Sequence, residues 1–220
     1  MKNHEAFLFE LYETVFDDSI AIEDRRTYLI DNIYTLLEKS FFPVKHSSVK
    51  KVIENLYDFI MKEKESGRIL NSFNQVDFII KELKINDIIL FKKIYDCYND
   101  SSLQISPKLY NNTMRILELL KEKGKKIYLI ANNFYTSGVI LRFLLKENNI
   151  YDFFSGFLFA DEYGKVFFDK LSLDYFKNKY CSDFLFITNL RNWHFEKGLE
   201  LELLSLTKGT DELYDLILSE

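Results

Sequence analysis

Cysteine is scarce in this sequence. Cys97 and Cys181 are the two cysteines among 220 residues, and they lie far apart without a neighbouring partner. This arrangement does not fit a metal knuckle or a paired redox motif. Because so little cysteine fits a reducing compartment, we expect a cytoplasmic protein.

Long apolar runs and clusters of basic residues are also missing. The apolar run at residues 6–9 is far shorter than the roughly 20 residues that cross a bilayer, so we expect neither a membrane segment nor an export signal. Basic residues number 29 and acidic residues 34, which gives a formal net charge of −5. Without a basic block, the chain lacks the electrostatic footprint of a nucleic-acid-binding protein.

Hydrophobic residues, by contrast, are abundant. They make up 47% of the chain, which is enough to bury a substantial interior in one large domain or in a core with an insert. We therefore expect a soluble globular protein.

The first hundred residues contain two different patterns. Residues 5–11 (EAFLFEL) form a short apolar run that is consistent with a buried strand. Between about Ile22 and Tyr98, apolar residues recur at spacings of three and four, and polar or turn-forming stretches interrupt them at residues 40–48, 66–72 and 85–87. The spacing predicts four helices in succession.

After Pro107, helical segments alternate with short apolar runs. The pattern predicts helices at residues 108–123, 138–146, 173–179 and 211–218, and strands at residues 127–131, 157–160, 183–188 and 199–206. Such alternation is typical of βαβ units and a parallel sheet, in which ligands bind beyond the carboxyl ends of the strands. We therefore expect functional residues directly after each strand.

The residues at these strand ends resemble a known family. Residues 7–15 (FLFELYETV) resemble the opening strand and loop of dehalogenase-type proteins of the haloacid dehalogenase (HAD) superfamily, which typically read apolar-apolar-Phe-Asp-Leu-Tyr-Gly-Thr-Leu. Glu10 stands at the position of that family's nucleophilic aspartate. Residues 128–133 (YLIANN) are similar to the second motif, in which Asn132 matches and Ala131 replaces the hydroxyl residue.

The later motifs are recognisable by order and spacing alone. Residues 161–164 (DEYG) echo the third region, and Phe167 takes the position of its lysine, with Lys165 and Lys170 on either side. The last motif, usually Gly-Asp followed by Asn-Asp, corresponds to residues 188–194 (TNLRNWH), in which Asn192 fits and both acids are absent.

The resemblance implies an α/β fold with a Rossmann-like, HAD-like parallel-sheet core and an inserted all-helical cap. Residues 1–16 and 101–220 would form the core, and residues 17–100 the cap.

The replaced acids determine the expected chemistry. Phosphoryl transfer in the family uses a carboxylate nucleophile and a Mg²⁺ ion held by that carboxylate and by the last-motif acids, and Mg²⁺ prefers anionic oxygen ligands. Glu10 is the one anion left at those positions. We therefore expect no metal site and no cofactor, with weak Mg²⁺ binding at most.

The geometry of a glutamate adds a second obstacle to catalysis. Its extra methylene displaces the carboxylate oxygens, and a misplacement of about 1 Å can cost roughly 100-fold in rate. The dehalogenase branch needs no metal, but it depends on the same aspartate, lysine and hydroxyl positions. Conventional HAD hydrolysis is therefore not expected.

Eight residues form the predicted pocket: Glu10, Tyr12, Thr14, Asn132, Asn133, Asn189, Asn192 and His194. Structural alternatives stay open for them. Glu10 could cap a neighbouring helix or pair with Arg191 or Lys165, and Tyr12 could be a packed loop residue. Asn132 and Asn133 could end a strand and cap the next helix, and His194 beside Trp193 could be structural.

Three functions are compatible with these residues. The first is a HAD-like protein with a degenerate site that binds an unidentified small molecule or protein partner as an accessory or regulatory protein. The second is a retooled enzyme that uses Glu10, with His194, as acid and base on a small molecule. The third is a conventional phosphatase or dehalogenase. The aromatic-rich helical segment could pack on a second copy of the chain or on the core, so a homo-oligomer stays open.

Overall fold

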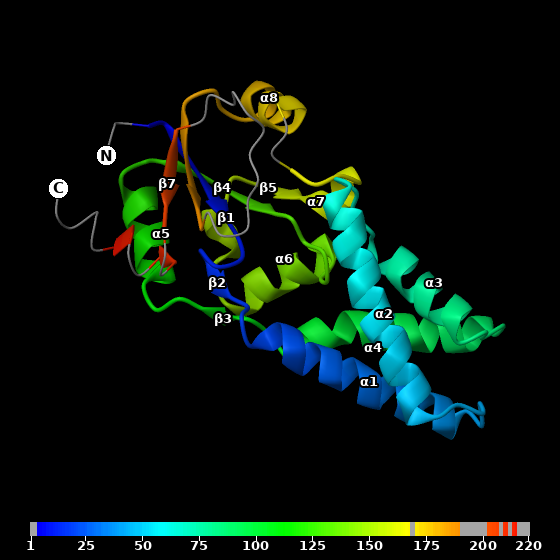
Figure 1. The fold of residues 1–220 in the computed structure, drawn as a ribbon. Coiled ribbons are helices and arrows are strands. Elements are labelled where there is room, and N and C mark those ends of the chain that lie inside the picture. Colours follow the sequence, from blue (N-terminus) through cyan, green and yellow to red (C-terminus); the bar gives the residue numbers. More distant parts are fainter. Residues whose placement is uncertain (1–3, 168–169, 190–201, 207–208, 211–212, 215–220) are drawn as a thin grey trace.

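The centre of the molecule is a five-stranded parallel sheet. The structure is a computed structural model that describes residues 4–167, 170–189, 202–206, 209–210 and 213–214. The strands lie in the order β5 (Gly156–Phe159), β4 (Lys126–Ala131), β1 (Ala6–Glu10), β6 (Phe184–Thr188) and β7 (Leu203–Ser205), and every pair is parallel (Figure 1). The predicted α/β fold with a parallel sheet is therefore confirmed.

The middle strand β1 is buried on both faces. Phe7 and Phe9 belong to one apolar cluster, whereas Ala6 and Leu8 belong to another. Successive side chains of a strand point to opposite faces of the sheet, so β1 contributes to two separate cores. This explains why its sequence is a continuous apolar run rather than an alternating one.

Helices cover both faces of the sheet. Helices α5 (Thr113–Glu122) and α6 (Gly138–Glu147) pack against the face of Phe7 and Phe9. Helix α8 (Lys170–Lys179) packs against the opposite face through side chains that include Phe176. The sheet is therefore the middle layer of a three-layer arrangement.

Four helices follow one another between β1 and the rest of the core and confirm the prediction for this stretch: α1 (Ala21–Lys39), α2 (His46–Glu65), α3 (Ser72–Glu82) and α4 (Ile88–Gln104). They project to one side of the sheet (Figure 1). They bury an apolar cluster of their own, in which Ile33, Ile53, Leu56 and Ile79 are fully enclosed. The helical insert therefore has an independent interior.

A short antiparallel hairpin joins the two ends of this insert. Strand β2 (Phe16–Asp17) precedes α1, strand β3 (Lys108–Leu109) follows α4, and Phe16 pairs with Leu109. The chain therefore leaves and re-enters the core at adjacent points. We propose on this basis that the insert is a separate unit; the predicted boundaries, residues 17–100, stay a prediction, and α4 continues past the second of them.

One predicted element differs from the structure, and two others lie partly or almost entirely outside the described residues. The helix expected from residue 108 begins at Thr113, because the first residues pair with β2 as β3 and Tyr110 N–H donates to Val15 O at 3.2 Å. The strand expected at residues 199–206 is described at Leu203–Ser205. The helix expected at residues 211–218 lies almost entirely outside the described residues.

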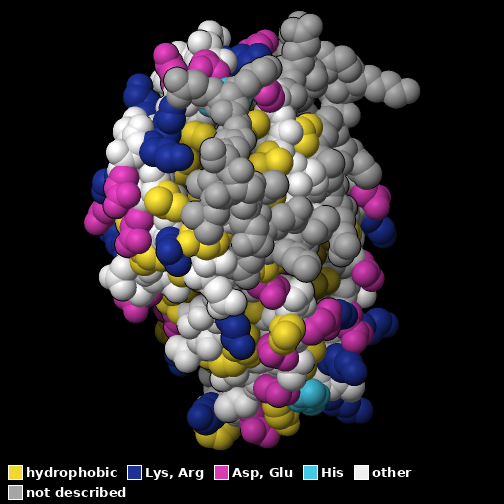
Figure 2. Space-filling model, turned by 90° about the vertical axis from the view of Figure 1, so that its left-hand side faces the viewer, with side chains coloured by type: hydrophobic (Ala, Val, Ile, Leu, Met, Phe, Trp, Pro, Cys, Tyr) yellow, Lys and Arg dark blue, Asp and Glu magenta, His cyan; other side chains and the backbone are white. Residues whose placement is uncertain are grey.

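Charged side chains of both signs are mixed on the molecular surface shown in Figure 2. Lys and Arg side chains lie among Asp and Glu side chains on this face, with hydrophobic side chains between them. Among the helices that the structure describes, none is both long enough and apolar enough to span a bilayer.

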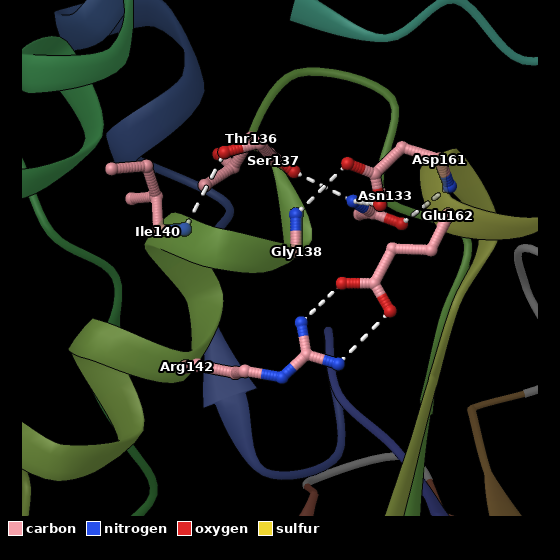
Figure 3. A network of polar contacts seen from close by, with 8 residues as sticks. All are labelled: Asn133, Thr136, Ser137, Gly138, Ile140, Arg142, Asp161 and Glu162. Atoms are coloured by element: carbon pink, nitrogen blue, oxygen red, sulfur yellow. Dashed lines mark hydrogen bonds and ion pairs between the residues drawn. The ribbon is translucent and has the colours of Figure 1, made fainter.

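A polar network connects the loop after β4 to helix α7 (Ala160–Tyr163) (Figure 3). Asp161 accepts hydrogen bonds from Asn133 Nδ2 at 2.6 Å and from Gly138 N–H at 3.0 Å. Asn133 Nδ2 also donates to Thr136 O at 2.8 Å. Since the first N–H groups of a helix have no partner within the helix, Asp161 satisfies the start of α6 from a different element.

We expect Asp161→Ala to lower the free energy of unfolding by about 1–3 kcal/mol, because Asn133 and the Gly138 N–H would lose their acceptor in a partly buried place. Urea denaturation followed by circular dichroism measures this change. Asp152→Ala is the matched control, since that side chain is exposed and should change stability by less than about 0.5 kcal/mol. Equal stability of the two variants would contradict the role given to the network.

Candidate functional site

The carboxyl ends of β1, β4 and β6 lie at one edge of the sheet, because all three strands are parallel. Glu10 ends β1, Asn132 follows β4 and Asn189 follows β6. These predicted pocket residues are therefore placed along the same edge. Asn192 and His194 lie outside the described residues.

The Glu10 side chain is buried and held by the neighbouring strand. It is 5% exposed. The Thr188 hydroxyl donates a hydrogen bond to Glu10 Oε2, and Asn189 N–H donates to the same oxygen at 3.3 Å. Hydrogen bonds to a carboxylate are charge-assisted, so this contact fastens the end of β1 to the end of β6.

Thr188 lies at the same edge, and the pocket prediction missed it. It ends β6, is fully buried and contacts Glu10 directly. The available signal was its place at the end of an apolar run, next to Asn189, on a strand that pairs with β1.

Asn132 organises the segment that carries the third motif. Its Oδ1 accepts a hydrogen bond from Phe167 N–H at 2.8 Å. The Phe167 side chain is 4% exposed and belongs to the apolar cluster that also contains Leu158 and Phe176. Phe167, which the sequence resemblance aligns with the family's lysine, therefore lies in an apolar environment, where a charged side chain would be costly to bury.

A loop of the helical insert pairs with this same segment. Arg68, between α2 and α3, forms an antiparallel bridge with Lys165, and Val166 N–H donates to Gly67 O at 3.2 Å. The insert therefore contacts the core through backbone hydrogen bonds beside the third-motif segment.

Asn133 takes part in the network with Asp161 and does not cap α6. The residue at the N-cap is Ser137, whose hydroxyl accepts from Ile140 N–H at 3.4 Å. Asn133 is 1% exposed, and its side chain positions the loop that follows β4. Its place in a ligand pocket stays a prediction.

Thr14 lies in the loop after β1 and is fully buried. Its carbonyl accepts a hydrogen bond from Thr210 N–H at 3.0 Å. Its hydroxyl has no hydrogen-bond partner among the described residues. A ligand role for this hydroxyl also stays a prediction.

Tyr12 lies near a buried ion pair that the sequence patterns did not reveal. Burial is the main cause that raises the pKa of the Tyr12 phenol, and the charge of Asp18 raises it further, while Arg25 lowers it. Asp18 and Arg25 are 5% and 3% exposed, and Arg25 Nη2 lies 2.6 Å from Asp18 Oδ2. No motif marks these two residues, because the sequence does not show that α1 turns Arg25 toward the loop after β2.

The described residues offer a poor set of metal ligands. No group of three His, Cys, Asp or Glu side chains among them could hold a metal ion. One oxygen of Glu10 already accepts two hydrogen bonds, and residues 188–194 contain no acid. Because Mg²⁺ requires an octahedron of oxygen ligands, preferably with negative charge, these residues do not fit the Mg²⁺ site of HAD phosphatases.

Glu13 has a backbone conformation that favours glycine. Its φ is +59°, in the left-handed region, and it occupies the glycine position of the HAD-like Leu-Tyr-Gly-Thr loop. Burial raises the pKa of its carboxyl group, and Asp17 raises it further. The loop therefore keeps the turn that glycine would provide, with a strained and partly buried acidic residue.

We expect Glu13→Gly to raise the free energy of unfolding by about 0.5–1 kcal/mol, because glycine adopts a positive φ without steric cost. Thermal and urea unfolding measure the difference. Glu13→Ala is the matched control, since alanine removes the carboxylate but keeps the strain. If alanine stabilises the protein as much as glycine does, the buried charge rather than the backbone causes the effect.

No family model and no curated protein matches the sequence. Solved structures do match its fold over nearly the whole chain. A 2-haloacid dehalogenase from Pseudomonas syringae pv. tomato is 15% identical, with a TM-score of 0.64 and coverage of 98% of this chain and 99% of that one. YfnB from Bacillus subtilis, a proposed HAD-hydrolase bound to magnesium, is 13% identical, with a TM-score of 0.60 and the same coverage of 98% and 99%.

A HAD phosphatase from Thermococcus onnurineus is 14% identical, with a TM-score of 0.56 and 97% of each chain covered. At these identities the likeness concerns the fold. The chain therefore has the fold of HAD-type hydrolases and haloacid dehalogenases.

Proposed function

We propose that this HAD-like protein binds a small molecule at the carboxyl edge of its sheet, as an accessory or regulatory protein, and does not carry out conventional HAD hydrolysis. The observation that supports this proposal best is the hydrogen bonding of the Glu10 carboxylate. Its Oε2 accepts hydrogen bonds from Thr188 and from Asn189 N–H, at the position where the family has its nucleophile.

Nucleophilic attack requires a carboxylate oxygen in line with the reacting atom. Hydrogen-bond donors stabilise the negative charge on Glu10 Oε2 and hold that oxygen against the end of β6. The arrangement suits a structural carboxylate that joins two strands, and it makes this oxygen a weaker nucleophile.

The surrounding charges support the same proposal. HAD hydrolysis requires groups that neutralise a developing negative charge. Phe167 fills the lysine position within an apolar cluster, and the last-motif segment contains no acid to hold Mg²⁺. Phosphoryl transfer would therefore lack both its ammonium group and its metal ion.

A second candidate function is hydrolysis that uses Glu10 directly. The retained carboxylate at the end of β1 favours it, and the structural neighbours include a haloacid dehalogenase and a phosphatase. A metal-independent reaction would not need the missing acids. In a related form of this hypothesis, Glu10 acts as an acid or base on another substrate. A protein partner or a second copy of the chain stays a further alternative.

Turnover of standard substrates distinguishes these proposals. We expect the purified protein to hydrolyse para-nitrophenyl phosphate, with or without Mg²⁺, and 2-chloropropionic acid no faster than its Glu10→Gln variant does. Released nitrophenol and chloride measure the two reactions. Glu10→Gln is the matched control because it keeps the size of the side chain. Hydrolysis by the natural sequence that disappears in this variant would establish the second candidate.

Binding of the metal ion is tested separately. We expect millimolar MgCl₂ to leave the unfolding temperature unchanged beyond the effect of NaCl at equal ionic strength, because a ligand at concentration L stabilises a fold by RT ln(1 + L/Kd), which is negligible when L stays far below Kd. Differential scanning fluorimetry measures the shift. A saturable rise with MgCl₂ that Glu10→Gln abolishes would mean that a metal site exists despite the missing acids.

A further inference from the structure

A cavity of about 650 Å³ opens between helices α3, α4 and α6. Its size lies within the roughly 300–1,000 Å³ of ordinary small-molecule sites. Ser137, Ile140 and Asp161, which line one side of it, surround the start of α6 (Figure 3). Among the described residues of the predicted pocket, none lines this cavity. It is therefore separate from the sheet edge, and we call it the α4 groove.

The charged side chains that line the α4 groove are all aspartates. Asp96 and Asp100 belong to α4, and Asp161 belongs to α7. Residues four apart lie on the same face of a helix, so Asp96 and Asp100 present their carboxylates side by side. Clefts lined by charges of one sign attract ligands of the opposite sign. The groove therefore favours a cation.

The aspartates on α4 have little competing positive charge. Lys92 Nζ lies 2.7 Å from Asp96 Oδ2, but both side chains are more than half exposed. Such a surface pair contributes roughly 0–1 kcal/mol, so a ligand can replace Lys92. Asp100 makes neither a hydrogen bond nor an ion pair within the described part of the chain. Both carboxylates are therefore available to a cationic ligand.

The positive groups on the opposite side of the groove are already engaged. Arg142 donates to both oxygens of Glu162. The starts of α3 and α6 carry partial positive charge, but Asn71 Oδ1 accepts from the first of them and Asp161 Oδ2 from the second. Since the donors that bind Asp161 are neutral amides, its negative charge is not cancelled.

A hydroxyl group within the groove has no partner. Ser72 lines the groove and is 5% exposed, and its hydroxyl makes no hydrogen bond within the described part of the chain. Buried polar groups of folded proteins are nearly always paired. A hydroxyl oxygen accepts a hydrogen bond from an ammonium group. Ser72 therefore indicates a ligand that donates hydrogen bonds, in agreement with the charge of the aspartates.

The remaining lining distinguishes an organic cation from a metal ion. No three His, Cys, Asp or Glu side chains of the described ranges are grouped so that they could hold a metal. Apolar groups complete the groove, namely the rings of Phe73 and Tyr95 and the side chains of Val139 and Ile140. Aromatic faces attract ammonium groups, and apolar side chains pack against methylene groups. A linear polyamine combines these features, because methylene chains separate its ammonium groups.

We propose that the α4 groove binds a linear polyamine. One ammonium group would lie against Asp96 and Asp100 and another near Asp161, with the methylene chain over the rings of Phe73 and Tyr95. Since α4 belongs to the helical insert and α7 to the core, the bound polyamine would hold the insert against the core. The inference goes beyond the proposed function, because it concerns a different site.

Titration calorimetry with spermidine, butylamine and MgCl₂ tests the proposal. Butylamine has a similar apolar chain with a single charge, whereas Mg²⁺ has charge without a chain. We expect saturable binding of spermidine, at least tenfold tighter than that of either control, which weakens as NaCl screens the carboxylates. No binding of spermidine, or equal affinity for butylamine or MgCl₂, would overturn the assignment.

Two double variants locate the site. Asp96→Asn with Asp100→Asn removes two adjacent charges from the groove, so spermidine should bind at least about fivefold more weakly. Glu54→Gln with Asp58→Asn is the matched control, because these residues are also four apart and lie on α2, outside the groove. It removes the same charge and should bind as the natural sequence does. Equal affinity of the two double variants would mean that spermidine binds to the overall negative charge alone.

Phe73→Ala tests the groove without changing its charge. The Phe73 side chain is 56% exposed, so its removal leaves the fold intact and should weaken spermidine binding several-fold. Phe41→Ala is the control, since Phe41 is also exposed and lies outside the groove, in the turn after α1. Equal affinity of these variants would also overturn the assignment. Glu10→Gln should bind spermidine as the natural sequence does, so this inference and the proposed function fail separately.

Discussion

The enclosure of β1 is the constraint on which the rest of the structure depends. This strand pairs with β4 and β6 on its two edges and packs into two different apolar clusters on its two faces. A strand buried on every side has one register, because a slip by one residue would reverse the direction of every side chain. The end of β1 is therefore fixed in space, and Glu10 is fixed with it. Thr188 and the other residues at the ends of the neighbouring strands can contact the Glu10 carboxylate only because this register is unique.

The conformation of the backbone at this edge of the sheet does not by itself determine which side chains it carries. The turn after β1 keeps the left-handed conformation of the HAD-like loop although Glu13 replaces the glycine, and Asn132 still organises the third-motif segment through Phe167 N–H. The left-handed turn is thus compatible with a side chain other than glycine at this position. A fold supplies positions, and the side chains at these positions decide the reaction. Phe167 illustrates this, because its side chain contributes to the apolar core.

The sequence predicted those features that depend on local pattern. The apolar run of β1, the four helices of the insert and the alternation after Pro107 follow from periodicity, and the structure contains each of them as far as the described residues extend. Pairing between distant segments could not be predicted in this way. Lys108 and Leu109 continue a helical pattern, yet they form β3 because β2 lies beside them. At the candidate site, the edge of the sheet was predictable from the positions of Glu10, Asn132 and Asn189. The pairing of Asp18 with Arg25 was not, since it depends on how α1 leaves the core.

The ion pair between Asp18 and Arg25 is a second electrostatic feature near the candidate site. Removing two charges from water is costly, and a buried pair is often no more stabilising than apolar side chains of the same volume. Stability alone therefore does not explain why Asp18 and Arg25 are buried together, with one guanidinium nitrogen unsatisfied. The buried guanidinium group lies near the phenols of Tyr12, Tyr57 and Tyr98, whose pKa values burial raises. Because the pair is neutral as a whole, it joins the loop after β2 to helix α1 without adding net charge to the interior.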